Sequence, residues 1–421
     1  MSSSNHHKWN IALFLIPIAA MAVLNLTKPG GSSDISTLEQ REVQAWPAFS
    51  MDKLVHGKLF KEYDNYFSDR FVFRNTFVEL GSSAKELKGL KGDDVSIVVQ
   101  KGDTGEQMSG GGASAVQLDD SGQLMTGKSS SKYLVVKDSA MLLYHYSPVA
   151  SEAYAKAINH LDSLVDSSVN VYSMLVPSQV EFVESEKLRK LSDSQKKAFE
   201  HVYSLLGDGV KPVPAYDSVA AHKNEYVYFR TDHHWTALGA YYAYEAVAKT
   251  MGFAPVPIGA YEKKEMPGYL GTSYAATLSA ALKNHPDTIT AYVPAVKNEY
   301  KVFKDGKNGK KRELVEGKIP KDGRGGYAVF LGGDFAMSRI STDVGNGKKL
   351  LVVKDSYANA LIPFLLSHFE EIELVDPRYF KGNLVAEIKE RGITDVLFVN
   401  GPVVTTYTGI AKLVEERLAA G

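Results

Sequence analysis

A histidine and an aspartate lie two positions apart in the sequence Asp232-His233-His234-Trp235. This stretch links an aromatic run at 226–229 to a helical pattern rich in Ala and Tyr, and loops of this kind often hold chemical groups on a rigid scaffold. Histidine titrates near neutral pH and can act as a general base, and a carboxylate on its other ring nitrogen fixes its tautomer. Asp232 and His234 therefore form a candidate base with its orienting acid.

Ser356 supplies a candidate nucleophile in a second segment. The apolar run 351–353 leads into this serine, and a helical pattern follows it. A serine hydroxyl needs a base at neutral pH, and backbone N–H groups at the start of a helix can stabilise an oxyanion. Two simpler alternatives stay open, because Ser356 could be an ordinary helix N-cap and Asp232 could cap the helix that begins near Thr236.

Beyond residue 340, strand patterns alternate regularly with helix patterns. Such alternation predicts parallel strands with right-handed crossovers, and active sites in these sheets lie at the carboxyl ends of the strands. Ser356 follows the first strand, Arg378 the second and Asn400 the third, so we expect them at one edge of the sheet. The predicted strands are 350–353, 371–375 and 395–399, and the predicted helices are 359–368, 384–391 and 409–419.

Three residues near these strand ends are candidates for oxyanion or substrate binding. Asn400 could donate its amide to an oxyanion, although a polar residue before Gly401 is also typical of a turn. Arg378 could bind an anionic or hydroxylated substrate group, or it could form a surface salt bridge with Asp376. Tyr357, directly after the serine, is the third candidate.

An α/β pattern extends upstream to about residue 133, so we assign 133–421 to one catalytic domain. The range 255–330 is less regular, with turns rich in glycine and lysine, and we predict a β-rich insertion or a substrate-facing lobe there. The predicted strands upstream of 340 are 133–136, 141–144, 169–175, 212–216, 226–229, 261–266, 288–293 and 300–303, and the predicted helices are 150–165, 187–206 and 236–251.

The first 132 residues divide into segments of different character. Residues 9–27 are almost continuously apolar, which predicts a single-pass membrane anchor or a signal peptide, with a buried core helix as the alternative. With an anchor, 1–8 would be a cytoplasmic tail and the remainder would lie outside the cytoplasm at the cell membrane. The range 28–98 is predicted to be a juxtamembrane helical segment, and 99–132, with its Gly and Ser runs, a flexible loop.

Composition excludes several classes of function. The 421 residues carry a net charge of −1, whereas a general nucleic-acid binder carries a basic excess. Because the chain has no cysteine, disulfides, thiol nucleophiles and thiolate metal sites are excluded. Asp232, His233 and His234 could each bind a metal ion, but three adjacent residues rarely converge on one ion, so we expect neither a metal nor a cofactor.

The motifs at 232–235 (Asp-His-His-Trp) and 354–357 (Lys-Asp-Ser-Tyr), with the strand that ends at Asn400, resemble the DHHW family. The segments 39–42 and 45–49 resemble that family's entry to its extracytoplasmic domain. The family is similar to the alginate O-acetyltransferases of the AlgJ and AlgX type. This resemblance implies an SGNH-hydrolase-like (flavodoxin-like) α/β fold, a parallel sheet flanked by helices, circularly permuted because the Asp and His precede the Ser.

The resemblance covers about residues 35–415 and carries catalytic roles onto Asp232, His234 and Ser356, and an oxyanion role onto Asn400. The oxyanion glycine of the family has no counterpart after the second strand. The implied function is O-acetyl transfer to a cell-envelope or secreted polysaccharide, with acetyl groups supplied by a multi-pass membrane acyltransferase. An acetyl esterase with the same triad and a non-catalytic glycan-binding or scaffold protein of the envelope are the alternatives.

Overall fold

The computed structural model describes residues 3–27, 35–36, 41–78, 80–81, 95–101, 130–303, 309–320, 323 and 325–419. The chain forms two compact units, Met1–Leu90 and Lys91–Gly421. Every residue that the sequence singles out for chemistry belongs to the second unit.

An eight-stranded sheet forms the centre of the second unit, with the strand order β11-β10-β12-β14-β13-β15-β6-β7. The strands from β14 to β7 run parallel, whereas β12, β10 and β11 extend one edge in antiparallel pairing. The prediction of a parallel sheet is therefore wrong for these three strands, and the sheet is mixed. The bounds are β6 Asn170–Leu175, β7 Val210–Val213, β10 Asn298–Phe303, β11 Lys310–Arg312, β12 Met337–Thr342, β13 Lys349–Lys354, β14 Glu371–Val375 and β15 Asp395–Asn400.

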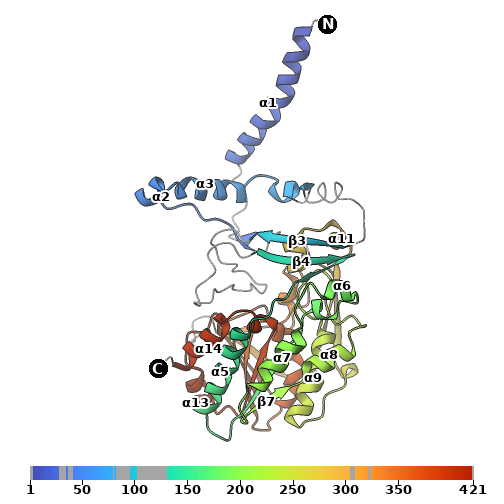
Figure 1. Ribbon diagram of the computed structural model, residues 1–421, viewed down its shortest axis with the longest axis vertical. Coiled ribbons are helices and arrows are strands. Elements are labelled where there is room, and N and C mark those ends of the chain that lie inside the picture. Colours follow the sequence, from blue (N-terminus) through green and yellow to red (C-terminus); the bar gives the residue numbers. More distant parts are fainter. Residues whose placement is uncertain are drawn as a thin grey trace. The chain divides into compact units, whose positions relative to one another are not determined.

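Both faces of this sheet are covered, because its central strands are apolar on both sides. Along β13, Leu350 and Val352 pack in one core, while Leu351 and Val353 pack in the other, as the two-residue period of a strand requires. The helices α5, α7, α13 and α14 supply the second core, and α8, α9 and α12 supply the first (Figure 1). Their bounds are α5 Pro148–Leu164, α7 Gln195–Ser204, α8 Ala215–Ala221, α9 Ala237–Met251, α12 Ile362–Leu365, α13 Leu384–Arg391 and α14 Gly409–Ala419.

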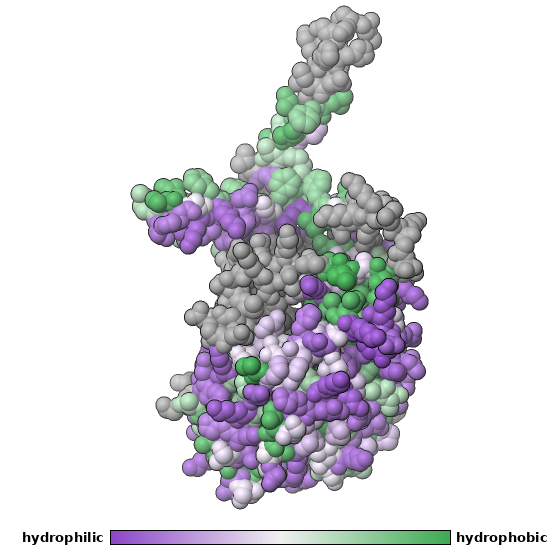
Figure 2. All heavy atoms as spheres, in the orientation of Figure 1, coloured by the Kyte–Doolittle hydropathy of each residue, from purple (hydrophilic) through white to green (hydrophobic). Residues whose placement is uncertain are grey.

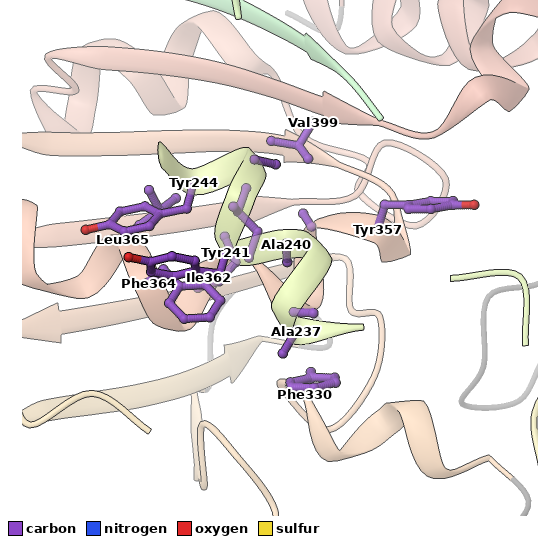
Figure 3. Packing of buried hydrophobic residues seen from close by; sticks show 14 of the residues in the cluster. Ala237, Ala240, Tyr241, Tyr244, Phe330, Tyr357, Ile362, Phe364, Leu365 and Val399 are labelled. Carbon is purple, nitrogen blue, oxygen red and sulfur yellow. The ribbon is translucent and has the colours of Figure 1, made fainter. Parts of the chain in front are cut away.

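Helix α9 is rich in Ala and Tyr because it packs closely against the segment that follows β13. Figure 3 shows Tyr241 and Tyr244 of α9 against Phe364 of α12. The ring centroids of Tyr244 and Phe364 lie 5.6 Å apart, and those of Tyr241 and Phe364 lie 5.4 Å apart. This packing holds the start of α9 beside the turn that carries Ser356.

Smaller elements complete the second unit. The predicted insertion 255–330 divides between an antiparallel pair, β8–β9, and strands β10 and β11 of the main sheet. The predicted loop 99–132 begins and ends in paired strands, β3 and β4, and its range 102–129 lies outside the described residues. The bounds are β3 Val95–Lys101, β4 Ser130–Val136, β5 Ser139–Leu142, β8 Glu262–Tyr269, β9 Asp287–Val293, α6 Glu186–Arg189, α10 Thr272–Thr277, α11 Ala280–Asn284, η1 Gln179–Phe182, η2 Ile258–Ala260, η3 Gly326–Val329, η4 Ser356–Ala360, η5 Leu366–His368 and η6 Pro402–Thr405.

The first unit contains helices with many exposed apolar side chains, and Figure 2 shows green patches on them between purple ones. A helix, α1, covers the predicted anchor and includes Pro17. Among the described residues, no helix is both long and apolar enough to cross a membrane. The bounds are α1 Ser3–Thr27, β1 Ile35–Ser36, β2 Arg41–Glu42, α2 Met51–Val55 and α3 Lys58–Asp69.

Candidate active site

The segment before α9 is a tight loop closed by backbone hydrogen bonds, not the strand predicted at 226–229. Its backbone forms an isolated antiparallel bridge between Tyr228 and Trp235, and Phe229 N donates to His234 O at 3.3 Å. Thr236 caps α9, because its hydroxyl accepts from Gly239 N at 3.2 Å. The helix-cap explanation for Asp232 is therefore wrong, and its carboxylate is left for other contacts.

Asp232, His234 and Ser356 form a continuous hydrogen-bonded series. His234 Nδ1 lies 2.5 Å from Asp232 Oδ1, and His234 Nε2 lies 2.8 Å from Ser356 Oγ. An ionised carboxylate only accepts, so Nδ1 carries the proton and the Nε2 lone pair accepts the serine O–H. All three side chains are almost fully buried, with exposed fractions of 1%, 1% and 4%. This arrangement can remove the serine proton as the hydroxyl attacks a carbonyl carbon.

Asp232 is held as an ionised, fully hydrogen-bonded group. Oδ1 also accepts from His234 N at 2.9 Å, while Oδ2 accepts from Thr272 N at 2.8 Å and Thr272 Oγ1 at 2.9 Å. Burial by itself raises the pKa of Asp232, but the two histidines and these hydrogen bonds lower the pKa well below its usual range. The acid that orients His234 is therefore charged at neutral pH.

Close backbone approach explains the glycine before α10. A Cβ on Gly271 would lie 2.3 Å from Asp232 Cβ and 2.4 Å from Asp232 Oδ2, so only glycine lets α10 begin against the carboxylate. Gly271 N also donates to Thr231 Oγ1 at 3.1 Å. Sequence reasoning missed Gly271 and Thr272, which lie in the irregular range 255–330 where no periodic pattern marks them.

Asp287 of β9 anchors the other side of the loop and was also missed. Its carboxylate accepts from Thr231 N at 2.8 Å, from Thr231 Oγ1 at 2.7 Å and from Tyr226 Oη at 2.5 Å. Arg230 donates to it through its backbone N and its Nε. Because these contacts join positions more than fifty residues apart, no local sequence signal predicts them.

The turn after β13 presents Ser356 without using it as a helix cap. Asp355 is the N-cap, and its Oδ1 accepts from Tyr357 N at 3.0 Å. Asp355 Oδ2 accepts from Gly401 N at 2.7 Å, which ties this turn to the end of β15. The N-cap explanation for Ser356 is therefore wrong, and its hydroxyl is available to His234.

Two further hydrogen bonds join the histidine loop to the serine turn. Trp235 Nε1 donates to Tyr357 O at 2.8 Å, and Tyr357 Oη donates to His233 O at 2.7 Å. Tyr327 stacks on the imidazole of His234 with a centroid distance of 3.8 Å and an interplanar angle of 4°. Trp235 and Tyr357 thus fix the position of the base relative to the nucleophile. The hydroxyl of Tyr357, a candidate for substrate binding, is engaged in this contact with the histidine loop.

Asn400 ends β15, one position beyond the pair formed by Lys354 and Val399. Its side-chain Oδ1 accepts from Tyr154 Oη at 2.8 Å, which fixes the direction of the amide. Within the part of the chain that is described, no hydrogen bond engages its Nδ2. Asn400 therefore keeps an N–H donor at the carboxyl edge that also carries Ser356.

Arg378 lies in a buried ion network, and its guanidinium is committed to two carboxylates. Its Nη2 lies 2.6 Å from Asp376 Oδ2 and 3.0 Å from Asp334 Oδ2, and Lys354 Nζ lies 2.7 Å from Asp334 Oδ1. The prediction that Arg378 could pair with Asp376 holds, but the pair is buried instead of exposed. This network supports the ends of β13 and β14 beneath the serine turn.

Asp232, His233 and His234 also present donor atoms within 4.8 Å of one another, a spacing that suits a metal ion. Most of their donor atoms are already engaged, because His234 Nδ1 binds Asp232 and His234 Nε2 binds Ser356. His233 Nδ1 lies 2.5 Å from Thr272 Oγ1. The donor set therefore fits a proton-transfer site better than a cation site.

The family to which this site belongs is shown by comparison with known proteins. Residues 110–375, more than half of the chain, match the sequence profile described as DHHW protein. The chain is also similar to a DHHW family protein from Eubacterium siraeum DSM 15702, with 32% identity and a TM-score of 0.63, over 68% of this chain and 95% of that one. This chain belongs to the DHHW family, which confirms the prediction from its motifs.

Two other solved structures are more distant. Bacillus cereus PatB1 with a sulfonyl adduct is 19% identical, with a TM-score of 0.54 over 65% of this chain and 96% of that one, which shows a related fold. The O-acetyltransferase domain of Pseudomonas putida AlgJ is 14% identical, with a TM-score of 0.36 over 65% of this chain and 94% of that one, a likeness too weak to carry an argument. Among curated proteins, none matches this sequence.

Proposed function

We propose that this protein is an extracytoplasmic O-acetyltransferase that acts on a cell-envelope or secreted polysaccharide. The observation that carries the proposal is the buried series of contacts from Asp232 through His234 to Ser356. A serine held by a histidine, with the histidine oriented by an ionised carboxylate, is the arrangement that acyl transfer uses.

The reaction proceeds in two balanced steps. In the first, Ser356 Oγ attacks the acetyl carbonyl carbon while His234 Nε2 takes its proton; the bond to the donor oxygen then breaks, and His234 returns the proton to that oxygen. In the second, a glycan hydroxyl oxygen attacks acetyl-Ser356, His234 takes the hydroxyl proton, and Ser356 Oγ leaves and recovers it. Asp232 stabilises the imidazolium in both steps.

Oxyanion stabilisation is assigned to Asn400 and to backbone N–H groups of the serine turn. The Nδ2 donor of Asn400, oriented by Tyr154, is preorganised for a charge that develops at the carbonyl oxygen. Asp355 binds Tyr357 N and Gly401 N and so fixes the backbone on both sides of the site. These two N–H groups are committed to its carboxylate, so the backbone donor that we assign to the oxyanion is Ser356 N.

The proposed fold is SGNH-hydrolase-like and circularly permuted, and the strand order supports this. When β13 is counted as the first strand, the order β14-β13-β15-β6-β7 becomes 2-1-3-4-5, which is the flavodoxin-like order. Strands four and five, β6 and β7, then come from the earlier part of the chain, so Asp232 and His234 precede Ser356. A polysaccharide acceptor and a multi-pass membrane acyltransferase as acetyl source are part of the proposal.

The test measures turnover of a chromogenic acetyl ester with and without a glycan acceptor, beside Ser356→Ala and His234→Ala. We expect both variants to lose turnover by about three orders of magnitude or more, and acetyl to appear on the glycan with the wild type. Acetate release without glycan acetylation would instead select an acetyl esterase with the same triad. Turnover that is absent in folded wild type, or unchanged in both variants, would leave a glycan-binding or scaffold role.

A further inference from the structure

His233, the middle residue of the motif, has a tautomer that its contacts fix. Its Nδ1 lies 2.5 Å from Thr272 Oγ1. The Thr272 hydroxyl donates its single proton to Asp232 Oδ2 at 2.9 Å, so it can only accept from His233. His233 therefore carries its proton on Nδ1 and presents a bare lone pair at Nε2.

His233 and His234 lie side by side and share one anchoring point. Their ring centroids are 3.9 Å apart with a tilt of 35°. Each ring directs Nδ1 toward the Asp232–Thr272 pair, so each presents Nε2 on the opposite edge. On that edge His234 Nε2 meets Ser356 Oγ, whereas His233 Nε2 has no hydrogen-bond partner within the described part of the chain.

At neutral pH the imidazole of His233 is uncharged and can accept a hydrogen bond. Burial, together with the neighbouring His234, lowers the pKa of His233 to about 3. Its side chain is nevertheless only half-buried, so a ligand can reach it. A neutral nitrogen with a free lone pair beside the catalytic base can accept a hydrogen bond from a hydroxyl group and cannot donate one to an anion.

We propose that His233 is an acceptor-recognition residue: its Nε2 accepts a hydrogen bond from the hydroxyl adjacent to the one that His234 deprotonates. The site then selects acceptors with vicinal hydroxyl groups, as on a sugar ring, because the Nε2 atoms of two adjacent imidazole rings can each accept from one of two neighbouring hydroxyl groups. This inference rests on the proposed acyl transfer and assigns a substrate feature to it.

The first test compares two acceptors within each enzyme variant. The full-length chain is given an acetyl ester donor with trans-1,2-cyclohexanediol or with cyclohexanol, and the ratio of the two transfer rates is measured. His233→Asn retains an N–H near the Nδ1 position for Thr272 but lacks the Nε2 acceptor. His233→Gln places an amide near the Nε2 position and gives up the Thr272 contact.

We expect the wild type to prefer the diol and His233→Asn to lose about five- to tenfold of that preference, the effect of one hydrogen bond. His233→Gln should retain more of the preference than His233→Asn does. If His233 only supported the loop through Thr272, His233→Asn would retain more of the diol preference than His233→Gln. An unchanged ratio of transfer rates in His233→Asn would overturn the proposal.

A second measurement separates this inference from the proposed function. In Ser356→Ala labelled with ¹⁵N-histidine, the Nε2 signal of His233, assigned by its loss in His233→Asn, should be unprotonated and should shift when the diol is added. If the wild type transfers acetyl to neither alcohol while this shift occurs, the acyl-transfer proposal fails and the recognition role stands. A protonated Nε2, or no shift with diol, contradicts the recognition role.

Discussion

At the scale of single residues, the site depends on a charged acid that orients the base. Asp232 accepts four hydrogen bonds from His234 and Thr272, and its side chain is almost fully buried. The sequence could predict Asp232, His234 and Ser356 because their types and spacing carry a chemical meaning. It could not predict Thr272 or Asp287, because a single polar residue in an irregular segment carries none.

Asp232→Asn tests this orienting role. An amide cannot satisfy the two Thr272 donors and also accept from His234 Nδ1, so the histidine loses its tautomer. We expect kcat for ester turnover to fall by about 10²- to 10⁴-fold, measured beside Asp217→Asn, whose carboxylate is 72% exposed. A variant that stays folded and within a few-fold of wild type would contradict the role.

At the scale of elements, the start of α10 must approach Asp232 closely. Gly271→Ala would place a Cβ 2.3 Å from Asp232 Cβ and displace the carboxylate, so we expect kcat to fall about tenfold or more, since small misplacements have large effects. Gly259→Ala is the matched control, because nothing lies within 4 Å of the added Cβ. Equal activity in both variants would show that this approach does not position the acid.

A buried glutamate on an inner strand of the sheet offers a prediction on pH. Glu373 of β14 is buried beside Arg339, with Oε2 accepting at 2.7 Å and 3.0 Å, and Oε1 has no partner among the described residues. Burial raises the pKa of Glu373 to about 7 from an ordinary value of 4.5. Between these values the folded state keeps a proton that the unfolded state has lost, so stability falls as pH rises.

Glu373→Gln removes this titration. We therefore expect its melting temperature, relative to wild type, to increase between about pH 4.5 and pH 7 and to level off above that range. Thermal unfolding of both proteins across that interval checks the expectation. A difference that stays constant with pH would mean that Glu373 does not bind a proton there.

The helices were predicted correctly where the local sequence pattern determines the secondary structure. The helices at 384–391 and 409–419 agree with α13 and α14, because amphipathic spacing and caps are local. The pairing of β10 with β12 was missed, because the partner of a strand depends on the rest of the fold. The same reason explains why the antiparallel edge of the sheet was not predicted.

At the scale of the whole molecule, the site belongs to one of the two compact units. The described contacts of Asp232, His234 and Ser356 all come from Lys91–Gly421. We expect residues 91–421, produced alone, to unfold cooperatively and to keep ester turnover within about threefold of the full chain, since a domain carries its own core. An unfolded or inactive fragment would show that Met1–Leu90 contributes to folding or to the site.

The most direct test of the central claim is intact-protein and peptide mass spectrometry after brief exposure to an acetyl ester. We expect one added acetyl group, located on Ser356, absent in Ser356→Ala and strongly reduced in His234→Ala. We also expect a sulfonyl fluoride to block the labelling. No acetyl group, or one located on a residue other than Ser356, would contradict a serine acyl-enzyme in this protein.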